Sequence, residues 1–251
     1  MLLIQHGMGE HGGRYRELAD DLAQNGIVTI LPDLRGFGKS GGRRGCVSDF
    51  SDYFKDLQVI QRVERSELPA NTPYFVLGHS FGGLVTASWI ASDATNDCRG
   101  LVLTSPCFGL ARPVPAWRHC LALAISRFLP NLTQSNNVDP ETLTHDATVT
   151  ARRRADFLIH DRISARLYVE MAHQQEVLED IASKIHCPVL VLQAGDDRVV
   201  SRQATDRFFQ KVASKDKKNK VFDTFYHEIL NEINHDAVVA ELRSWLINHI
   251  T

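Results

Sequence analysis

Short apolar runs recur along the chain, and most are followed by a stretch with helical periodicity. The runs lie at residues 2–5, 27–31, 74–77, 101–105 and 188–193, with a weaker one at 220–225. Apolar runs of this length, bounded by glycine or proline, are typical of buried strands. Strands that alternate with helices predict an α/β fold whose sheet is mostly parallel and whose crossovers are right-handed.

The stretches between these runs predict the flanking helices. Apolar residues at helical spacing lie at 15–25, 49–66, 82–90, 202–213 and 236–249. The first of these helices is expected to stop at Gly26, because glycine is the residue that most often ends a helix.

The alternation stops between Cys107 and about His186, where prolines, helical periodicity and polar turns occur without a clear strand. Such a length is too great for a loop in a compact domain, so we predict an inserted helical cap before the penultimate strand. The predicted division is core 1–106, cap 107–186 and core 187–251. Within the cap, the apolar stretch 117–129 is expected to form a helix that either faces lipid or substrate or packs on the core. A second cap helix is expected at 164–174.

Composition limits the class of protein. The 251 residues carry a formal net charge of −2 and 43% hydrophobic residues, as expected of one globular domain with an insertion. No charge excess steers the molecule toward nucleic acid, and the basic clusters at 152–154 and 215–220 are interpreted as solvated faces or loops.

The five cysteines are widely separated and form no C-x-x-C pair, which favours reduced thiols over a disulfide framework or a zinc site. The first residues lack the basic flank and long apolar core of a signal peptide, and no segment has the length of a transmembrane helix. We therefore expect a cytoplasmic protein that can also be peripheral at membranes.

The strongest candidate for chemistry is Gly78-His-Ser80-Phe-Gly82, a G-x-S-x-G motif between a predicted strand and a predicted helix. In this context the motif is that of a nucleophile elbow, in which a tight, strained turn holds the serine at a helix N-terminus. The alternative is a structural serine in a glycine-rich turn. Ser80 is our candidate nucleophile.

Two further residues complete a predicted catalytic triad in the chain order serine, acid, histidine. Asp197 follows a buried strand and is preferred to Asp196, which is expected to cap the turn. His227 follows the last predicted strand and has the position of the general base, although a surface histidine is the simpler alternative.

The loop that follows the first strand is rich in glycine and is expected to complete an oxyanion hole. Met8 would supply one backbone N–H and Phe81, the residue after the nucleophile, the other. The histidines at 6 and 11 lack the carboxylate or cysteine spacing of a metal site. Asp33 and Arg35 are interpreted as paired structural charges in their loop rather than as catalytic residues.

Together these pieces resemble the monoacylglycerol lipase and lysophospholipase branch of the α/β-hydrolases. The matching stretches are 6–15 (His-Gly-Met-Gly-Glu-His-Gly-Gly-Arg-Tyr), 33–40, 47–50, 78–83, 197–198 and 226–227. The first stretch is the most specific, because G-x-S-x-G is shared by most of the superfamily.

The resemblance implies an α/β-hydrolase fold and supports the roles of the predicted triad and oxyanion hole. It also implies that Glu10 and Arg14 shape the glycerol side of the pocket, unless the two simply pair with each other. The chain differs from the usual pattern of this branch in two respects. The antiparallel strands that usually precede the His-Gly strand are expected to be absent, and Phe81 stands where this branch often has methionine.

The implied activity is hydrolysis of a lipid ester, most simply a monoacylglycerol or a lysophospholipid, with no metal or organic cofactor. General carboxylesterases, thioesterases and peptidases of the same fold are alternatives, and so is a non-catalytic binding protein. A dehalogenase or epoxide hydrolase would have aspartate at Ser80. The expected partners are the lipid ester and, transiently, a membrane surface contacted by the cap; the oligomeric state is left open.

Overall fold

The computed structural model describes residues 1–92 and 97–250, which fold around a six-stranded sheet. The strand order is β2-β1-β3-β4-β7-β8, and every neighbouring pair is parallel. The strands are β1 (Leu2–Gln5), β2 (Thr29–Ile30), β3 (Phe75–His79), β4 (Gly100–Thr104), β7 (Val189–Ala194) and β8 (Lys217–Phe222). This confirms the predicted parallel sheet, and among the described residues no antiparallel strand joins it.

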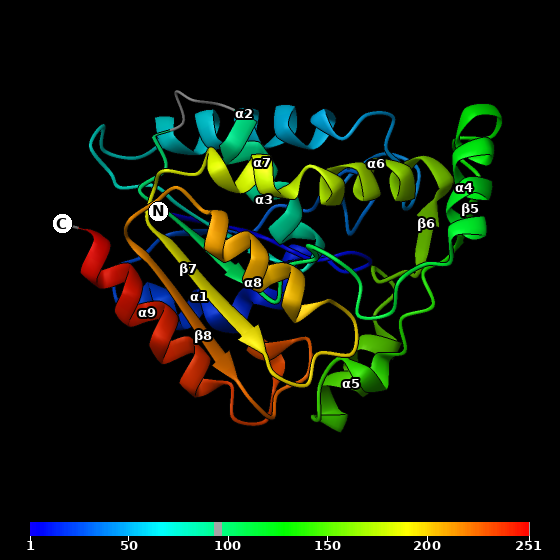
Figure 1. Ribbon diagram of the computed structural model, residues 1–251. Helices are drawn as coiled ribbons and strands as arrows, with labels where there is room; N and C mark the ends of the chain where they lie inside the picture. The colour runs from blue at the N-terminus through cyan, green and yellow to red at the C-terminus, as the bar shows by residue number, and fades with distance from the viewer. Residues whose placement is uncertain (93–96, 251) are drawn as a thin grey trace.

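The four central strands are buried along their whole length because helices cover both faces of the sheet. One face packs against α2 (Ser51–Ser66), α3 (Phe81–Ser92), α7 (Leu178–Ser183) and α8 (Arg202–Lys211). The other packs against α1 (Arg16–Ala23), which follows the short helix η1 (Gly12–Tyr15), and α9 (Asp236–Ile250). Figure 1 shows α2, α3 and α7 on one side of the strands and α9 on the other.

The edge strands differ most from the prediction. β2 has two residues instead of the five expected, and β8 begins at Lys217, within the lysine cluster that we interpreted as a solvated face or loop. An edge strand needs only backbone pairing on one side, so it tolerates polar residues. Here Lys218 and Lys220 also pair with Glu241 of α9, at 2.6 and 2.9 Å.

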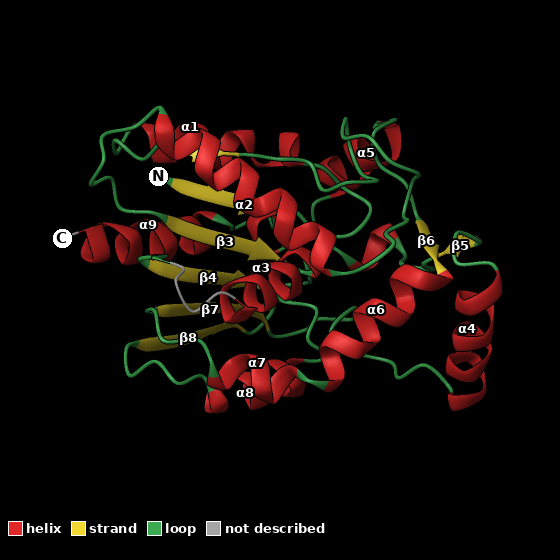
Figure 2. Ribbon diagram, turned by 90° about the horizontal axis from the view of Figure 1, so that it is seen from above, coloured by secondary structure: helices red, strands yellow, loops and turns green. Residues whose placement is uncertain are grey.

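The segment between β4 and β7 lies beyond the carboxyl ends of the strands, and Figure 2 shows the strand arrows pointing toward it. Its elements are α4 (Ala116–Phe128), β5 (Thr133–Ser135), the short helix η2 (Pro140–Thr142), α5 (Ala147–Ala155), β6 (Arg162–Ser164), α6 (Ala165–Glu176) and α7. The expectation of a strand-free segment is wrong, because β5 and β6 form an antiparallel pair. Three-residue strands with polar sequences give no apolar run to detect.

Helix α4 lies against α6, and Ser126 is its only buried residue. Of the two alternatives for the stretch 117–129, packing on the core is therefore wrong. Within the described residues, no helix is both long enough and apolar enough to cross a membrane.

Candidate active site

Ser80 lies in a strained turn between β3 and α3, as the motif predicts. Its φ of +51° is in the left-handed region, which costs a non-glycine residue about 1–3 kcal/mol and persists only when neighbours hold it. Its N–H donates to the Thr104 carbonyl at 3.0 Å, and its own carbonyl accepts from the Gly83 N–H at 2.9 Å. These contacts hold the side chain at the carboxyl end of the sheet.

The loop after β1 lies directly against this turn. A Cβ atom on Gly7 would come within 3.1 Å of the Ser80 Cβ, and one on Gly82 would lie 2.3 Å from the Gln5 carbonyl oxygen. Among the described residues, the N–H groups of Met8 and Phe81 have no hydrogen-bond acceptor. Two unused donors beside a serine have the character of an oxyanion hole.

The three predicted triad residues meet at one place. His227 Nε2 lies 2.8 Å from Ser80 Oγ, and His227 Nδ1 lies 2.8 Å from Asp197 Oδ2. The other Asp197 oxygen accepts from the backbone N–H groups of Val199 and Val200 at 2.9 Å each. All three side chains come from loops at the carboxyl ends of β3, β7 and β8.

The neighbouring carboxylate, Asp196, does not reach this group. Its side chain is half exposed and pairs with Arg198 at 2.9 Å. The geometry therefore separates the two aspartates that the sequence left in competition.

The electrostatics of the group favour an ionised acid beside a basic imidazole. Burial alone would lower the pKa of His227, but the charge and hydrogen bond of Asp197, together with the charges of Glu228 and Glu10, hold that pKa above its usual range. Burial alone would raise the pKa of Asp197, but the charge and hydrogen bond of His227 lower it. The adjacent His79, buried and close to His227, has its pKa lowered to about 4 and is therefore neutral near pH 7.

Glu10 and Arg14 pair with each other, as the simpler alternative held; Glu10 is buried, and the side chain of Arg14 is only 11% exposed. Arg14 also forms a bidentate ion pair with Glu228, at 2.9 and 2.6 Å. Glu10 accepts from the Gly7 N–H at 2.6 Å and from the Tyr15 hydroxyl at 2.9 Å. The two side chains are thus used in internal contacts that tie the loop after β1 to Glu228, the residue after His227.

Sequence reasoning missed two members of this cluster. Glu228 follows His227 directly in the sequence, and this adjacency is the only sequence feature that could have identified it as part of the site. Arg153, in the basic run that we interpreted as solvated, contacts Glu228 at 3.1 Å with 13% of its side chain exposed. For this residue the interpretation is wrong.

Asp33 and Arg35 are structural charges, but they do not pair with each other. Asp33 accepts from the N–H groups of Gly12 and Lys39 at 2.7 Å each. Arg35 forms its shortest ion pair with Asp56, at 2.6 Å.

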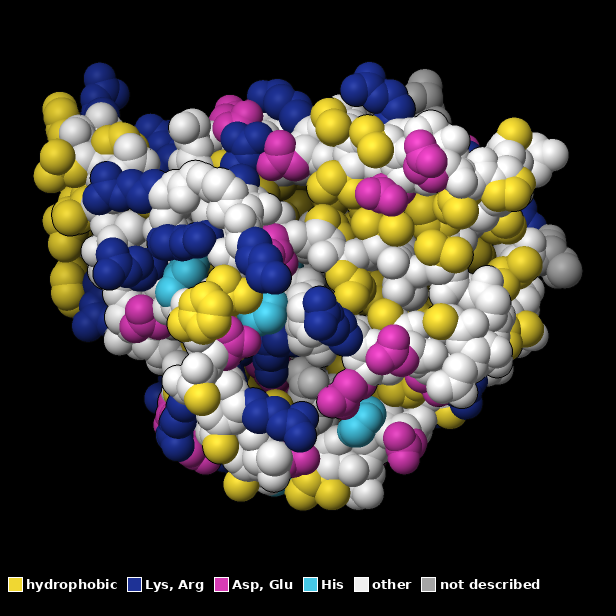
Figure 3. Space-filling view, turned by 180° about the vertical axis from the view of Figure 1, so that it is seen from behind, with side chains coloured by type: hydrophobic (Ala, Val, Ile, Leu, Met, Phe, Trp, Pro, Cys, Tyr) yellow, Lys and Arg dark blue, Asp and Glu magenta, His cyan; other side chains and the backbone are white. Residues whose placement is uncertain are grey.

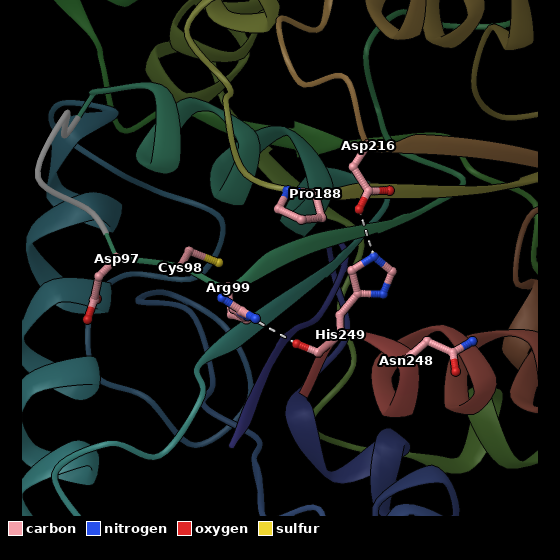
Figure 4. A pocket seen from close by; sticks show the side chains of 7 residues that line it. All are labelled: Asp97, Cys98, Arg99, Pro188, Asp216, Asn248 and His249. Atoms are coloured by element: carbon pink, nitrogen blue, oxygen red, sulfur yellow. Dashed lines mark hydrogen bonds and ion pairs between the residues drawn. The ribbon is translucent and has the colours of Figure 1, made fainter. Parts of the chain in front are cut away.

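A separate pocket opens at the opposite end of the sheet, near the amino ends of β4 and β7 (Figure 4). Several of its polar groups already contact one another: His249 pairs with Asp216 at 3.1 Å, and Arg99 donates to the His249 carbonyl at 3.1 Å. Here the structure also brings two of the scattered cysteines, Cys98 and Cys187, close enough to influence each other's pKa. The five cysteines, all in the described part of the chain, are thiols, and the described residues contain no cluster suited to a metal ion.

Comparison with known proteins places the chain in a family. The sequence profile of the family described as Serine aminopeptidase, S33 matches residues 1–234. Human monoglyceride lipase is 30% identical over 98% of this chain and 82% of its own length, and Bacillus subtilis phospholipase YtpA is 29% identical over 100% and 96%. An uncharacterized abhydrolase domain-containing protein of Dictyostelium discoideum is 30% identical over 98% of this chain, which spans only 26% of that protein.

A solved structure agrees with this assignment. The monoacylglycerol lipase of Paleococcus ferrophilus superposes with a TM-score of 0.91 at 29% identity, over 99% of this chain and 94% of that one. The chain belongs to the S33 family of serine hydrolases with the α/β-hydrolase fold, and within it to the monoacylglycerol lipase branch.

Proposed function

We propose that this protein hydrolyses carboxylic esters of lipids, with a monoacylglycerol as the preferred substrate class. The observation that carries the proposal is the continuous relay from Ser80 Oγ through His227 to Asp197, with both hydrogen bonds at 2.8 Å. Membership of the monoacylglycerol lipase branch supports the choice of substrate.

In this proposal His227 Nε2 removes the hydroxyl proton of Ser80 as Oγ attacks the ester carbonyl carbon. Asp197 holds the imidazole in the required tautomer and stabilises the imidazolium. The N–H groups of Met8 and Phe81 stabilise the oxyanion, and loss of one such donor typically costs about 3 kcal/mol.

Collapse of the tetrahedral intermediate breaks the ester bond, and the leaving alcohol takes the proton from His227. Water, deprotonated by the same imidazole, then attacks the acyl-enzyme and releases the fatty acid with a free Ser80. We assign residues 107–186 the role of the cap over this site, where each acyl methylene that leaves water contributes about 0.8 kcal/mol.

The test is fatty-acid release from a long-chain monoacylglycerol, compared with a lysophospholipid, an acyl thioester, a short p-nitrophenyl ester and an aminoacyl amide. We expect the highest kcat/KM for the monoacylglycerol. Preference for the lysophospholipid would favour the activity suggested by the B. subtilis relative. Failure of a fluorophosphonate to label the folded protein would instead favour a binding protein.

A lipid surface is the proposed partner of helix α4. Its exposed apolar side chains include Trp117 and Phe128, which are 63% and 76% exposed, and they form a column along one edge of the molecule in Figure 3. The helix contains two arginines and no acidic residue, so its charge suits an anionic bilayer.

Phe128→Ser is expected to reduce binding to vesicles of phosphatidylcholine and phosphatidylglycerol by about tenfold, because a buried aromatic side chain contributes about 1.5–3 kcal/mol. Co-sedimentation measures the bound fraction. Val63→Ser is the control, since Val63 is 52% exposed on α2 rather than on α4. Equal losses for the two variants would argue against α4 as the contact.

A further inference from the structure

The loop that carries the proposed general base (residues 226–232, the base loop) is fastened to the 107–186 segment by backbone and side-chain contacts. Glu232 accepts from the Tyr226 N–H at 2.7 Å and from His145 at 2.9 Å. The His145 ring also stacks on Tyr226, with ring centroids 3.6 Å apart. The loop is therefore held on both sides of His227.

The contact closest to the base is ionic. Glu228 is 3% exposed and binds two arginines: Arg14 from η1, at 2.6 Å, and Arg153 from α5, at 3.1 Å. The neighbours of Arg153 on the same helix face solvent, since the side chains of Arg152 and Arg154 are 71% and 58% exposed. Only one member of the arginine run points into the protein.

Charge balance explains why this arginine is needed. Glu10 and Glu228 are both buried and ionised, because the attraction of arginines lowers their pKa values even though burial alone would raise them. Arg14 alone would leave one negative charge uncompensated in a poorly solvated place. Arg153 brings the cluster to two positive and two negative charges.

We propose that Arg153 is a positioning residue for the general base: through Glu228 it couples helix α5 to the orientation and electrostatic environment of His227. This inference rests on the proposed function, because it concerns the same base. It assigns a role in the chemistry to a helix that contributes no reacting group.

Several charged or titratable groups face His227 from the elements packed around it. Those that act on its charge are Asp197, Glu228, Glu10 and His79, with Arg14 and Arg153 opposing the two glutamates. Glu228 favours the imidazolium and raises the pKa of His227. Removal of Glu228 should therefore lower that pKa, and removal of Arg153 should raise it.

The experiment compares Arg153→Gln, Glu228→Gln and wild type by the pH dependence of Ser80 labelling with a fluorophosphonate. Labelling requires neutral His227, so its rate falls on the acid side as the base is protonated. We expect the midpoint of the acid-side fall in labelling rate to move to higher pH in Arg153→Gln and to lower pH in Glu228→Gln, each by on the order of half a pH unit. We also expect the limiting rate to fall about tenfold in both.

Two controls separate this role from a structural one. Arg154→Gln removes an exposed arginine from the same helix and should leave the profile unchanged, and Arg153→Lys keeps the charge and should restore the midpoint. Folding of each variant is checked by thermal unfolding. If Glu228→Gln does not fold, the test rests on two results: the pH midpoint of labelling should rise in Arg153→Gln and should return to the wild-type value in Arg153→Lys.

Absence of any shift in Arg153→Gln relative to Arg154→Gln, or shifts of the same sign in Arg153→Gln and Glu228→Gln, would overturn the inference. Labelling reports on the nucleophile and base without the natural substrate. A labelled wild type with unshifted variants would therefore refute the positioning role alone, whereas an unlabelled, inactive wild type would refute the proposed function.

Discussion

Replacement of Ser80 by alanine is expected to lower kcat for ester hydrolysis by about 10⁶-fold, because no other group in the relay can form the acyl-enzyme. The fold should be unaffected, since alanine occupies the same left-handed turn and only the hydrogen bond to His227 is lost. The measurement is fatty-acid release by purified wild type and variant, with the unfolding temperature of each recorded.

The chain contains a matched control for this substitution. Ser105 is also buried and left-handed, with a φ of +40°, and follows the neighbouring strand β4. Within the described part of the chain its hydroxyl has no hydrogen-bond partner. Ser105→Ala should therefore keep near-wild-type activity. Substantial activity in Ser80→Ala would mean that the nucleophile lies elsewhere.

Gly78→Ala is expected to have the largest effect on stability among the substitutions considered. A Cβ at Gly78 would lie 2.2 Å from Thr86 Oγ1 and 2.6 Å from the Gly82 carbonyl oxygen, so α3 would have to move away from β3. Overpacking typically lowers the free energy of unfolding by about 1–3 kcal/mol. A clash with backbone atoms, which cannot move aside as a side chain can, is expected to cost about 3 kcal/mol or more. A cost near 3 kcal/mol corresponds to a fall of about 10 °C in Tm for a chain of this length.

Gly41→Ala is the comparison, because a Cβ at Gly41 meets no atom within 4 Å and its φ lies outside the left-handed region. Its stability should stay within about 0.5 kcal/mol of wild type. Thermal unfolding measures both variants, and activity at low temperature reports any displacement of Ser80. A Gly78→Ala protein as stable as Gly41→Ala would show that the strand and helix are packed less tightly than the distances imply.

The parts of the fold that were predictable have a local physical cause. The strands at β1, β3, β4 and β7 are mostly apolar because they are buried on both faces. The turn at Ser80 needs glycine on both sides because backbone passes within van der Waals distance there. Requirements of this kind restrict which residue types can occupy nearby positions, so they can be recognised in the sequence.

The parts that were not predictable depend on contacts between distant segments. β8 is a strand because its backbone pairs with β7 and its lysines reach Glu241, neither of which appears in its own polar sequence. The β5–β6 pair is held together across 26 intervening residues, from Ser135 to Arg162. The preference for Asp197 over Asp196 came from position along the chain, whereas the 2.8 Å contact between Asp197 and His227 depends on how distant segments fold together.

The sequence by itself determined the parallel α/β core, the turn that presents Ser80 and the chain order of the candidate triad, because these rest on short patterns with strict steric demands. Tertiary structure alone decided which arginine of 152–154 is buried. Successive residues on a helix point about 100° apart, so three identical residues face different surroundings. Only the packing of α5 beside the base loop brings Arg153 to Glu228, and that packing is a property of the whole chain.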